Sequence, residues 1–113
     1  MHTHVLLDLT CLERGLPPLS SDANDVVDMI LRSNPIERRR INRKIRKLCK
    51  TAMKHNRSEA TYMRPQEMTA HQESILKYLG LKQNKKYFDR HVLRRRIEYV
   101  RRFMMRVSQH LNL

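Results

Sequence analysis

Glycine, tryptophan and long apolar runs are all scarce in this sequence. Its 113 residues include two glycines, Gly15 and Gly80, and no tryptophan, whereas Met, Leu, Ile, Arg and Lys are plentiful. This composition is typical of helices, and the length fits one domain of about 100–150 residues. The apolar run that starts at Val5 ends at Asp8, far short of the roughly 20 residues that a membrane helix needs. We therefore expect an all-α fold and no membrane partner.

Residues suited to catalysis or metal binding are equally sparse. Cys11 and Cys49 stand apart without CxxC spacing, which argues against a zinc ribbon or a disulfide scaffold and favours a reducing compartment. Among the histidines only His2 and His4 are close in sequence, and the recurring ligand spacings of metal sites are missing. The sequence has no Gly-rich phosphate loop, no nucleophile elbow and no paired carboxylates. We expect no enzyme, no metal, no cofactor and no small-molecule substrate.

Acidic residues are few, and the charge is unevenly distributed along the chain. The sequence holds 24 basic and 11 acidic residues, a formal charge of +13. Residues 1–33 contain two basic and five acidic residues, so their net charge is −3. Residues 34–113 contain 22 basic and six acidic residues, so their net charge is +16. A function based on positive charge therefore belongs to residues 34–113.

Residues 34–57 are predicted to form one long helix with two different faces. Asn34 can cap its first turn, and Pro35 suits the first helical position. At about 100° per residue one side carries an apolar stripe made of Ile41, Ile45, Leu48 and Ala52. The opposite side carries seven cations: Arg39, Arg43, Arg46, Lys47, Lys50, Lys54 and Arg57. Glu37 is the only acid in this stretch, so a polyanionic partner is favoured over a merely solvated surface.

The remainder divides into an N-terminal arm and shorter helical segments. Pro17 and Pro18 forbid a continuous helix, so residues 1–21 are predicted as an irregular arm and residues 22–113 as a single basic helical domain. We expect a short helix over residues 22–32, capped by Ser21 or Asp22, and a loop over residues 56–64.

A third helix is predicted to begin at Pro65 or Thr69 and to be capped at its C-terminus by Gly80. Asn84 could cap the last helix, which we expect over about residues 85–111. Together these elements predict a small bundle of about four helices, two of them long, basic and amphipathic.

The last helix has the clearest apolar spacing in the chain. Its stripe consists of Leu93, Ile97, Val100, Met104, Val107 and Leu111. Opposite this stripe lie Arg95, Arg102 and Arg106, with Arg90, Arg94 and Arg101 along one flank. Arg96 projects near the apolar side, where we expect it to snorkel or to pair with an acid such as Asp28. Cys49 sits at the margin of the other apolar stripe and is interpreted as a small buried thiol.

Aromatic residues make up 5% of the sequence and are scattered, which argues against a platform for stacking bases. Tyr87 and Phe88, beside Lys85 and Lys86, are the one place where aromatic and basic residues interleave. Closure of the core by Phe88 is the preferred interpretation of that pair.

Arginine-rich helical faces without an aromatic platform suit binding to phosphates and to shape, as on folded RNA. We therefore expect a structural RNA-binding protein of a ribonucleoprotein, favouring a component of a cytoplasmic or mitochondrial ribosomal subunit that binds rRNA. Residues 1–33 would contact neighbouring proteins of the assembly. The candidate RNA-binding residues are Arg39, Arg43, Arg46, Lys47, Lys50, Lys54, Arg57, Arg94, Arg95, Arg101, Arg102 and Arg106.

Two other classes of function remain open at this point. The helix, Gly-containing turn and helix within residues 68–106 could form a helix-turn-helix DNA reader, although the second helix is long and base-reading Asn or Gln residues are scarce. The apolar stripe from Leu93 to Leu111 could instead bind a partner helix in a protein-interaction or assembly factor.

Overall fold

The computed structural model describes residues 22–60, 62–82 and 89–111, with side chains as far as residue 107. It contains four helices in these ranges: α2 (Ala23–Arg32), α3 (Pro35–Glu59), α4 (Pro65–Tyr78) and α5 (Arg90–Leu111). No strand occurs within them. The predicted all-α fold is thus confirmed, while the predicted arm, residues 1–21, lies outside the described residues.

The starts of α2 and α3 follow from their capping residues. The side chain of Asp22 accepts a hydrogen bond from the amide of Asn24 at 2.8 Å, and that of Asn34 accepts one from the amide of Glu37 at 2.9 Å. Each bond satisfies an amide that has no partner inside the helix. Pro35 occupies the first turn of α3, as the sequence predicts.

The predicted loop over residues 56–64 is wrong in its first part, because α3 continues to Glu59. Packing against α5 explains the extension. The side-chain amide of Asn56 donates to the hydroxyl of Tyr99 at 2.9 Å, and the ring of His55 meets that of Phe103 edge-on, with centroids 5.3 Å apart. Such tertiary contacts override the weak helix propensity of a polar segment.

The start of α5 also differs from the prediction, since the helix begins at Arg90 and not near residue 85. Asp89 caps it: one carboxylate oxygen accepts from the amides of His91 at 2.7 Å and Val92 at 3.2 Å. These bonds lower the pKa of Asp89 because they stabilise its charged form. The predicted cap, Asn84, lies outside the described residues.

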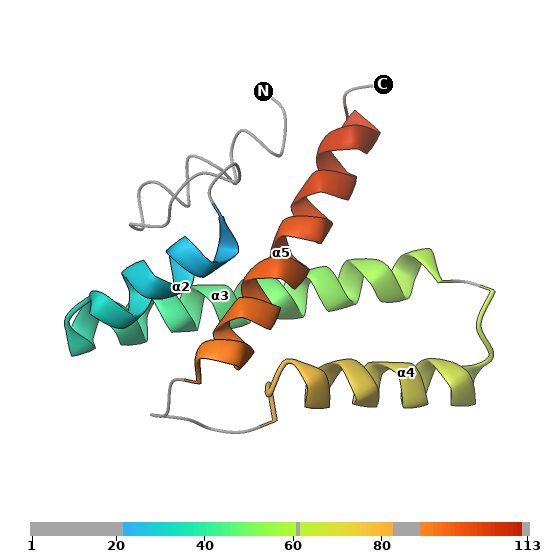
Figure 1. Ribbon diagram of the computed structural model, residues 1–113. Helices are drawn as coiled ribbons and strands as arrows, with labels where there is room; N and C mark the ends of the chain where they lie inside the picture. Colours follow the sequence, from blue (N-terminus) through green and yellow to red (C-terminus); the bar gives the residue numbers. More distant parts are fainter. Residues whose placement is uncertain (1–21, 61, 83–88, 112–113) are drawn as a thin grey trace.

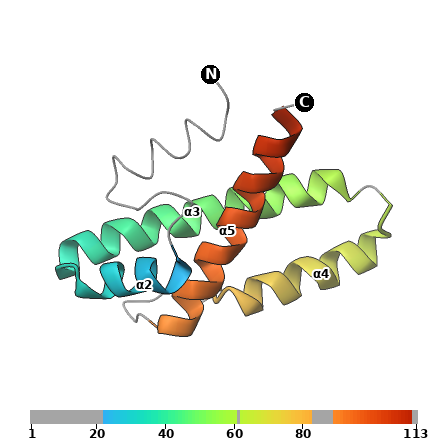
Figure 2. The same cartoon turned by 45° about the horizontal axis from the view of Figure 1, so that its top comes forward.

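Figure 1 shows two layers, with α5 in one and α2 and α3 in the other. α2 and α3 run antiparallel, α5 crosses both of them, and α4 runs back in the direction opposite to α3, as Figure 2 confirms from a second angle. The molecule is flat, with extents of 44 × 35 × 19 Å, close to the thickness of two helices.

One hydrophobic core joins α2, α3 and α5. The predicted stripe of α3 and that of α5 as far as Val107 point into it, together with residues of α2 and of the segment that follows α4. Its buried members are Val26, Val27, Ile30, Ile41, Ile45, Leu48, Cys49, Ala52, Met53, Leu79, Leu81, Leu93, Ile97, Val100, Phe103 and Met104. Burying this apolar surface supplies the main favourable free energy of folding.

Helix α4 is anchored at its C-terminal end. None of its own side chains is fully buried, but Leu79 and Leu81, which follow it, lie in the core. The amide of Gly80 donates to the carbonyl of Lys77 at 3.1 Å, and the amide of Leu81 donates to that of Leu76 at 3.0 Å. This pair of bonds defines a Schellman motif, which requires the positive φ of 63° found at Gly80. The predicted glycine cap is confirmed.

Candidate nucleic-acid interface

The outer face of α3 is a row of exposed cations. We use this name for Arg39, Arg43, Lys47, Lys50, Lys54 and Arg57, all of which are exposed. They lie opposite the buried stripe of the same helix, as the spacing predicts. From the first to the last of them the helix rises about 27 Å at ~1.5 Å per residue. The face is therefore long enough to meet several phosphates in succession.

The cations of the outer face have no acidic partners within the described part of the chain. α3 contains two acids, one near each end: Glu37 is paired with Arg40, whose guanidinium lies 2.9 Å from the carboxylate, and Glu59 forms no ion pair with a cation of the outer face. On the outer face itself, Arg39 donates to the carbonyl of Pro35 at 3.3 Å. Close cations with no counter-charge repel one another, so an anion bound there would relieve the repulsion.

The predicted cations of α5 differ from one another in exposure and in their contacts, unlike those of the outer face. Arg102 and Arg106 are exposed, whereas Arg94, Arg95 and Arg101 are half-buried. Arg94 lies 4.0 Å from the carboxylate of Glu98. The guanidinium of Arg95 lies over the ring of Tyr78, 4.9 Å from its centroid. The α5 residues do not form a single uninterrupted face like that of α3.

The cations of the outer face of α3 and those of α5 do not form one continuous patch. α3 and α5 bury their apolar stripes in the same core, so the sides opposite those stripes point away from each other. A flat molecule with positive charge on two opposed sides can contact two separate anionic surfaces.

Arg46 belongs to a different environment from its neighbours on α3. It is half-buried, and its guanidinium donates to the carbonyl of Leu81 at 3.1 Å. This bond ties α3 to the segment that follows α4. Of the seven predicted α3 cations, six therefore share the outer face and Arg46 lies apart from it.

Among the charged residues that the structure describes, Arg96 is the most buried, with 5% of its surface exposed. Its guanidinium donates to the carbonyls of Leu79 at 2.8 Å and Gly80 at 3.1 Å, and to the side-chain oxygen of Asn42 at 2.8 Å. We call Arg46, Arg96 and these acceptors the core junction. Two of the acceptors lie just past the C-terminus of α4, where the helix dipole favours a cation.

The predicted pairing of Arg96 with Asp28 is wrong. Asp28 instead forms an ion pair with Arg90 at the beginning of α5. Burial lowers the pKa of Arg96, and the nearby charge of Arg46 adds to this effect. Backbone carbonyls replace the expected carboxylate because the segment after α4 packs directly against this turn of α5.

Cys49 lies beside the core junction, and the predicted buried thiol is confirmed. None of its surface is exposed, and its sulfur lies 3.8 Å from the carbonyl oxygen of Arg96. Burial raises its pKa to about 12, because a thiolate would lose its hydration there. A thiol in this state is a packing group and not a nucleophile.

A groove between α4 and α5 escaped prediction from the sequence. It has a volume of about 590 Å³, and its walls include Tyr78, Tyr99 and Met105, with Arg102 and Arg106 beside them. We call it the α4–α5 groove. The two tyrosines lie on different helices, so no local spacing in the sequence could have shown that they come together. The predicted aromatic pair, Tyr87 and Phe88, lies outside the described residues.

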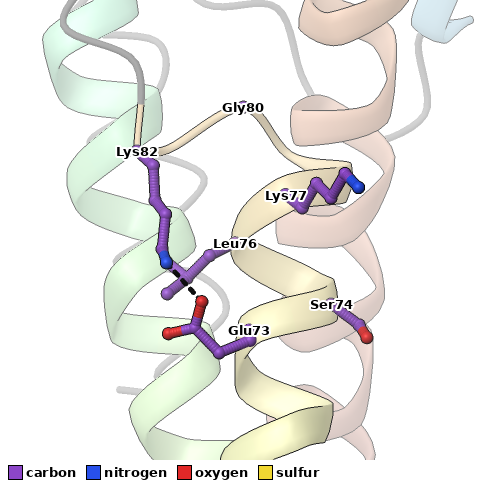
Figure 3. Close-up of a pocket in the computed structure, with 6 residues that line it drawn as sticks. All are labelled: Glu73, Ser74, Leu76, Lys77, Gly80 and Lys82. Atoms are coloured by element: carbon purple, nitrogen blue, oxygen red, sulfur yellow. Dashed lines mark hydrogen bonds and ion pairs between the residues drawn. The ribbon is translucent and has the colours of Figure 1, made fainter.

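A second hollow at the end of α4 is less suited to a ligand. It has a volume of about 300 Å³ and lies beside Gly80. Figure 3 shows Glu73 and Lys82 reaching toward each other to form an ion pair, while Ser74 and Lys77 point away from that pair. The carboxylate of Glu73 and the ammonium group of Lys82 are already joined, and the other lining cation, Lys77, points away from them, so the charges of this hollow do not converge on a ligand.

His, Cys, Asp and Glu side chains form no group of three or more that could hold a metal ion anywhere in the part of the chain that the structure describes. In the same ranges no helix has the length and apolar character that crossing a bilayer requires. We found no match to the chain among protein-family models, curated proteins or solved structures. Function must therefore be argued from the charges and surfaces themselves.

Proposed function

We propose that this protein binds folded RNA through its phosphates, using the outer face of α3, and serves as a structural component of a ribonucleoprotein. The observation that carries the proposal is the row of six exposed cations without an acidic partner in the described chain. Lys and Arg that neutralise phosphates release counterions from the nucleic acid, which favours binding. A row of point charges does not distinguish one base from another, so shape and charge would govern recognition.

The positions of the asparagine side chains of α3 support binding of the outer face to phosphates and not to bases. Asn and Gln side chains are the usual readers of adenine in a DNA groove. The side-chain oxygen of Asn42 accepts from Arg96, and that of Asn56 is held beside Tyr99 by the bond that its amide donates. Asn42 is thus buried, Asn56 lines the α4–α5 groove, and neither belongs to the outer face. The outer face contains only Lys and Arg among its six members.

The geometry of α4 and α5 argues against the helix-turn-helix alternative. Residues 79–89 separate the two helices, whereas that motif uses a turn of about three or four residues. α5 spans 22 residues and lies across α2 and α3, with Leu93, Ile97 and Met104 buried beneath it. A recognition helix must instead insert into a major groove.

The burial of the same stripe argues against the partner-helix alternative. From Leu93 to Met104 its apolar members contribute to the chain's own core. Val107 is half-buried, and the side chain of Leu111 lies outside the described residues. Most of the surface that a partner helix would need is therefore occupied within this chain.

The assembly we favour is a ribosomal subunit, cytoplasmic or mitochondrial, with residues 1–33 contacting neighbouring proteins. The opposed positive sides of the molecule support a position between RNA segments. Sedimentation of native lysate with and without RNase tests this assignment. We expect the protein to migrate with ribosomal subunits and to lose that position after RNase treatment; a light position that RNase does not change would contradict it.

The binding surface itself is tested by reversing charge on the outer face. We expect Arg43→Glu, Lys47→Glu and Lys50→Glu together to weaken binding to a 12-base-pair RNA duplex by about 100-fold or more, because three phosphate contacts become repulsive. The measurement is fluorescence anisotropy at fixed salt, with circular dichroism to show that the variant is folded.

A matched variant controls for net charge. Arg32, Arg64 and Lys77 are exposed but lie off the outer face. Changing these three to Glu alters the total charge equally, and we expect a loss of affinity of about tenfold or less, since only long-range attraction is reduced. Equal losses in the two variants would show that the outer face has no special role.

A further inference from the structure

The α4–α5 groove combines features that separate it from the rest of the surface. Tyr78 and Met105 are 54% and 55% exposed and both line the groove, whereas the more exposed Ile36 and Tyr62 lie outside it. Tyr99 and Ile75 supply half-buried walls, and Arg102 and Arg106 are exposed beside them. None of the lining residues is Asp or Glu. The groove is therefore apolar within, positive at its edge and suited to a ligand with both a flat apolar part and a negative charge.

Both tyrosine rings are held in place. Arg95 lies over the ring of Tyr78 at 4.9 Å from its centroid, a cation–π contact that fixes the ring while more than half of the residue stays exposed. The hydroxyl of Tyr99 accepts a hydrogen bond from Asn56 at 2.9 Å. Burial raises the pKa of Tyr99, so its ring stays uncharged near neutral pH. Rings fixed in this way lose little further freedom when a ligand binds.

The arginines at the edge could take a phosphate. Arg102 and Arg106 lie one helical turn apart on α5, and no ion pair joins either of them to an acid in the described ranges. Two guanidinium groups at this spacing can both reach one phosphate group or two successive ones. An acidic ligand is thus favoured at the same place where the tyrosines favour a flat apolar one.

We infer that the α4–α5 groove binds an unpaired nucleotide of RNA, with its base against Tyr78 and Tyr99 and its phosphate on Arg102 and Arg106. The inference rests on the proposed function and adds a second, single-stranded contact to it. Unpaired bases of RNA are typically bound by stacking on aromatic side chains, and arginine contributes to such sites. Because its base is unpaired, this nucleotide belongs to a segment of RNA other than the duplex that the outer face binds.

The size of the groove favours a nucleotide over a protein helix. Its volume of about 590 Å³ lies within the range of roughly 300–1,000 Å³ for sites that hold small molecules. Two turns of an α-helix about 10–12 Å in diameter would occupy on the order of 1,000 Å³. A partner helix could therefore place only part of its volume in the groove.

The test compares two RNA probes on the full chain: single-stranded penta-adenylate and the 12-base-pair duplex. We expect Tyr78→Ala to weaken binding of penta-adenylate by about tenfold, as loss of one stacked base would do, and to change duplex binding by less than twofold. Tyr78→Phe keeps the ring and should retain the affinity for penta-adenylate. Tyr62→Ala, at a tyrosine 82% exposed and outside the groove, should alter neither.

The two proposals fail in different ways. If the duplex binds but penta-adenylate binding is insensitive to Tyr78→Ala, the inference about the groove is overturned and the proposed function stands. If neither RNA binds, both are wrong. If Tyr78→Ala instead abolishes capture of a 15-residue acidic amphipathic peptide while penta-adenylate binding is unchanged, the groove is a site for protein and the nucleotide assignment is overturned. Melting curves followed by circular dichroism verify that each variant is folded.

Discussion

The arginines of the core junction and the cations of the outer face are the same kinds of residue in opposite situations. In the junction, Arg96 has three acceptors and 5% exposure; on the outer face, cations such as Arg43 are exposed and have no acid nearby in the described chain. The junction holds the fold, and the outer face is available to a partner. The count of 24 basic residues therefore overstates the number of cations that can bind a polyanion, because Arg46 and Arg96 are committed to the fold.

The core junction is unusual because the buried charge of Arg96 is balanced by the dipoles of carbonyl groups and not by a carboxylate. Removing a guanidinium from water is costly unless its hydrogen-bonding groups find acceptors. Arg96 finds two carbonyls after the C-terminus of α4, and Arg46 reaches a third at Leu81. One arginine from each long helix thus positions α4, a helix with no fully buried side chain of its own.

The largest predicted effect comes from breaking the junction. Arg96→Met keeps an unbranched apolar stem but removes the guanidinium, which leaves the acceptors at Leu79, Gly80 and Asn42 without their donor. Each buried acceptor left unpaired costs about 1–3 kcal/mol, so we expect a total loss of about 3–5 kcal/mol in the free energy of unfolding. Urea denaturation followed by circular dichroism measures it.

Arg102→Met is the control for this change, because Arg102 lies on the same helix and is exposed. We expect it to alter stability by less than about 0.5 kcal/mol. A loss below about 1 kcal/mol in Arg96→Met would mean that the junction does not stabilise the fold.

A smaller effect is predicted at Gly80, the turn that presents carbonyls to Arg96. Gly80→Ala should cost about 1–2 kcal/mol, because a φ of +63° is unfavourable for a residue with a Cβ atom. The added Cβ would lie 3.4 Å from the nearest atom, on Val92, so the cost comes from the backbone and not from a clash. Gly80→Asn should cost less, since Asn tolerates this conformation better. Equal losses of stability in both variants would contradict the backbone explanation.

The sequence predicted the parts of this structure that depend on local spacing. Residue types a few positions apart predict several features that the structure contains. These are the caps at Asp22 and Asn34, the glycine at the end of α4, the two apolar stripes and the burial of Cys49. The end of α3 and the start of α5 were misplaced. In the first case the decisive contact, Asn56 with Tyr99, joins residues on two helices.

The partners of Arg96 and the α4–α5 groove could not be predicted for a related reason. Backbone carbonyls carry no signature in the sequence, so residue types alone favour a carboxylate such as Asp28 as the partner of Arg96. Arg46 was grouped with the outer face because it lies only about 40° from Lys50 around the helix. The segment after α4 packs on that flank and takes Arg46 out of the group. Six of the seven predicted α3 cations nevertheless share one exposed face.

A small change in stability is predicted for the outer face, and the same variant tests the central claim most directly. Arg43→Gln, Lys47→Gln and Lys50→Gln together should change the free energy of unfolding by less than about 0.5 kcal/mol per site, since exposed substitutions away from caps cost little. The measurement is the dissociation constant for the 12-base-pair RNA duplex over a series of salt concentrations. The matched variant carries Gln at Arg32, Arg64 and Lys77.

We expect the outer-face variant to reduce the magnitude of the slope of log K against log salt by about 2–3, because each lost phosphate contact removes nearly one released counterion. The matched variant should keep the slope of the unaltered protein within about 0.5. An unchanged slope in the outer-face variant, or the same reduction in both, would contradict the claim that this face of α3 binds RNA phosphates.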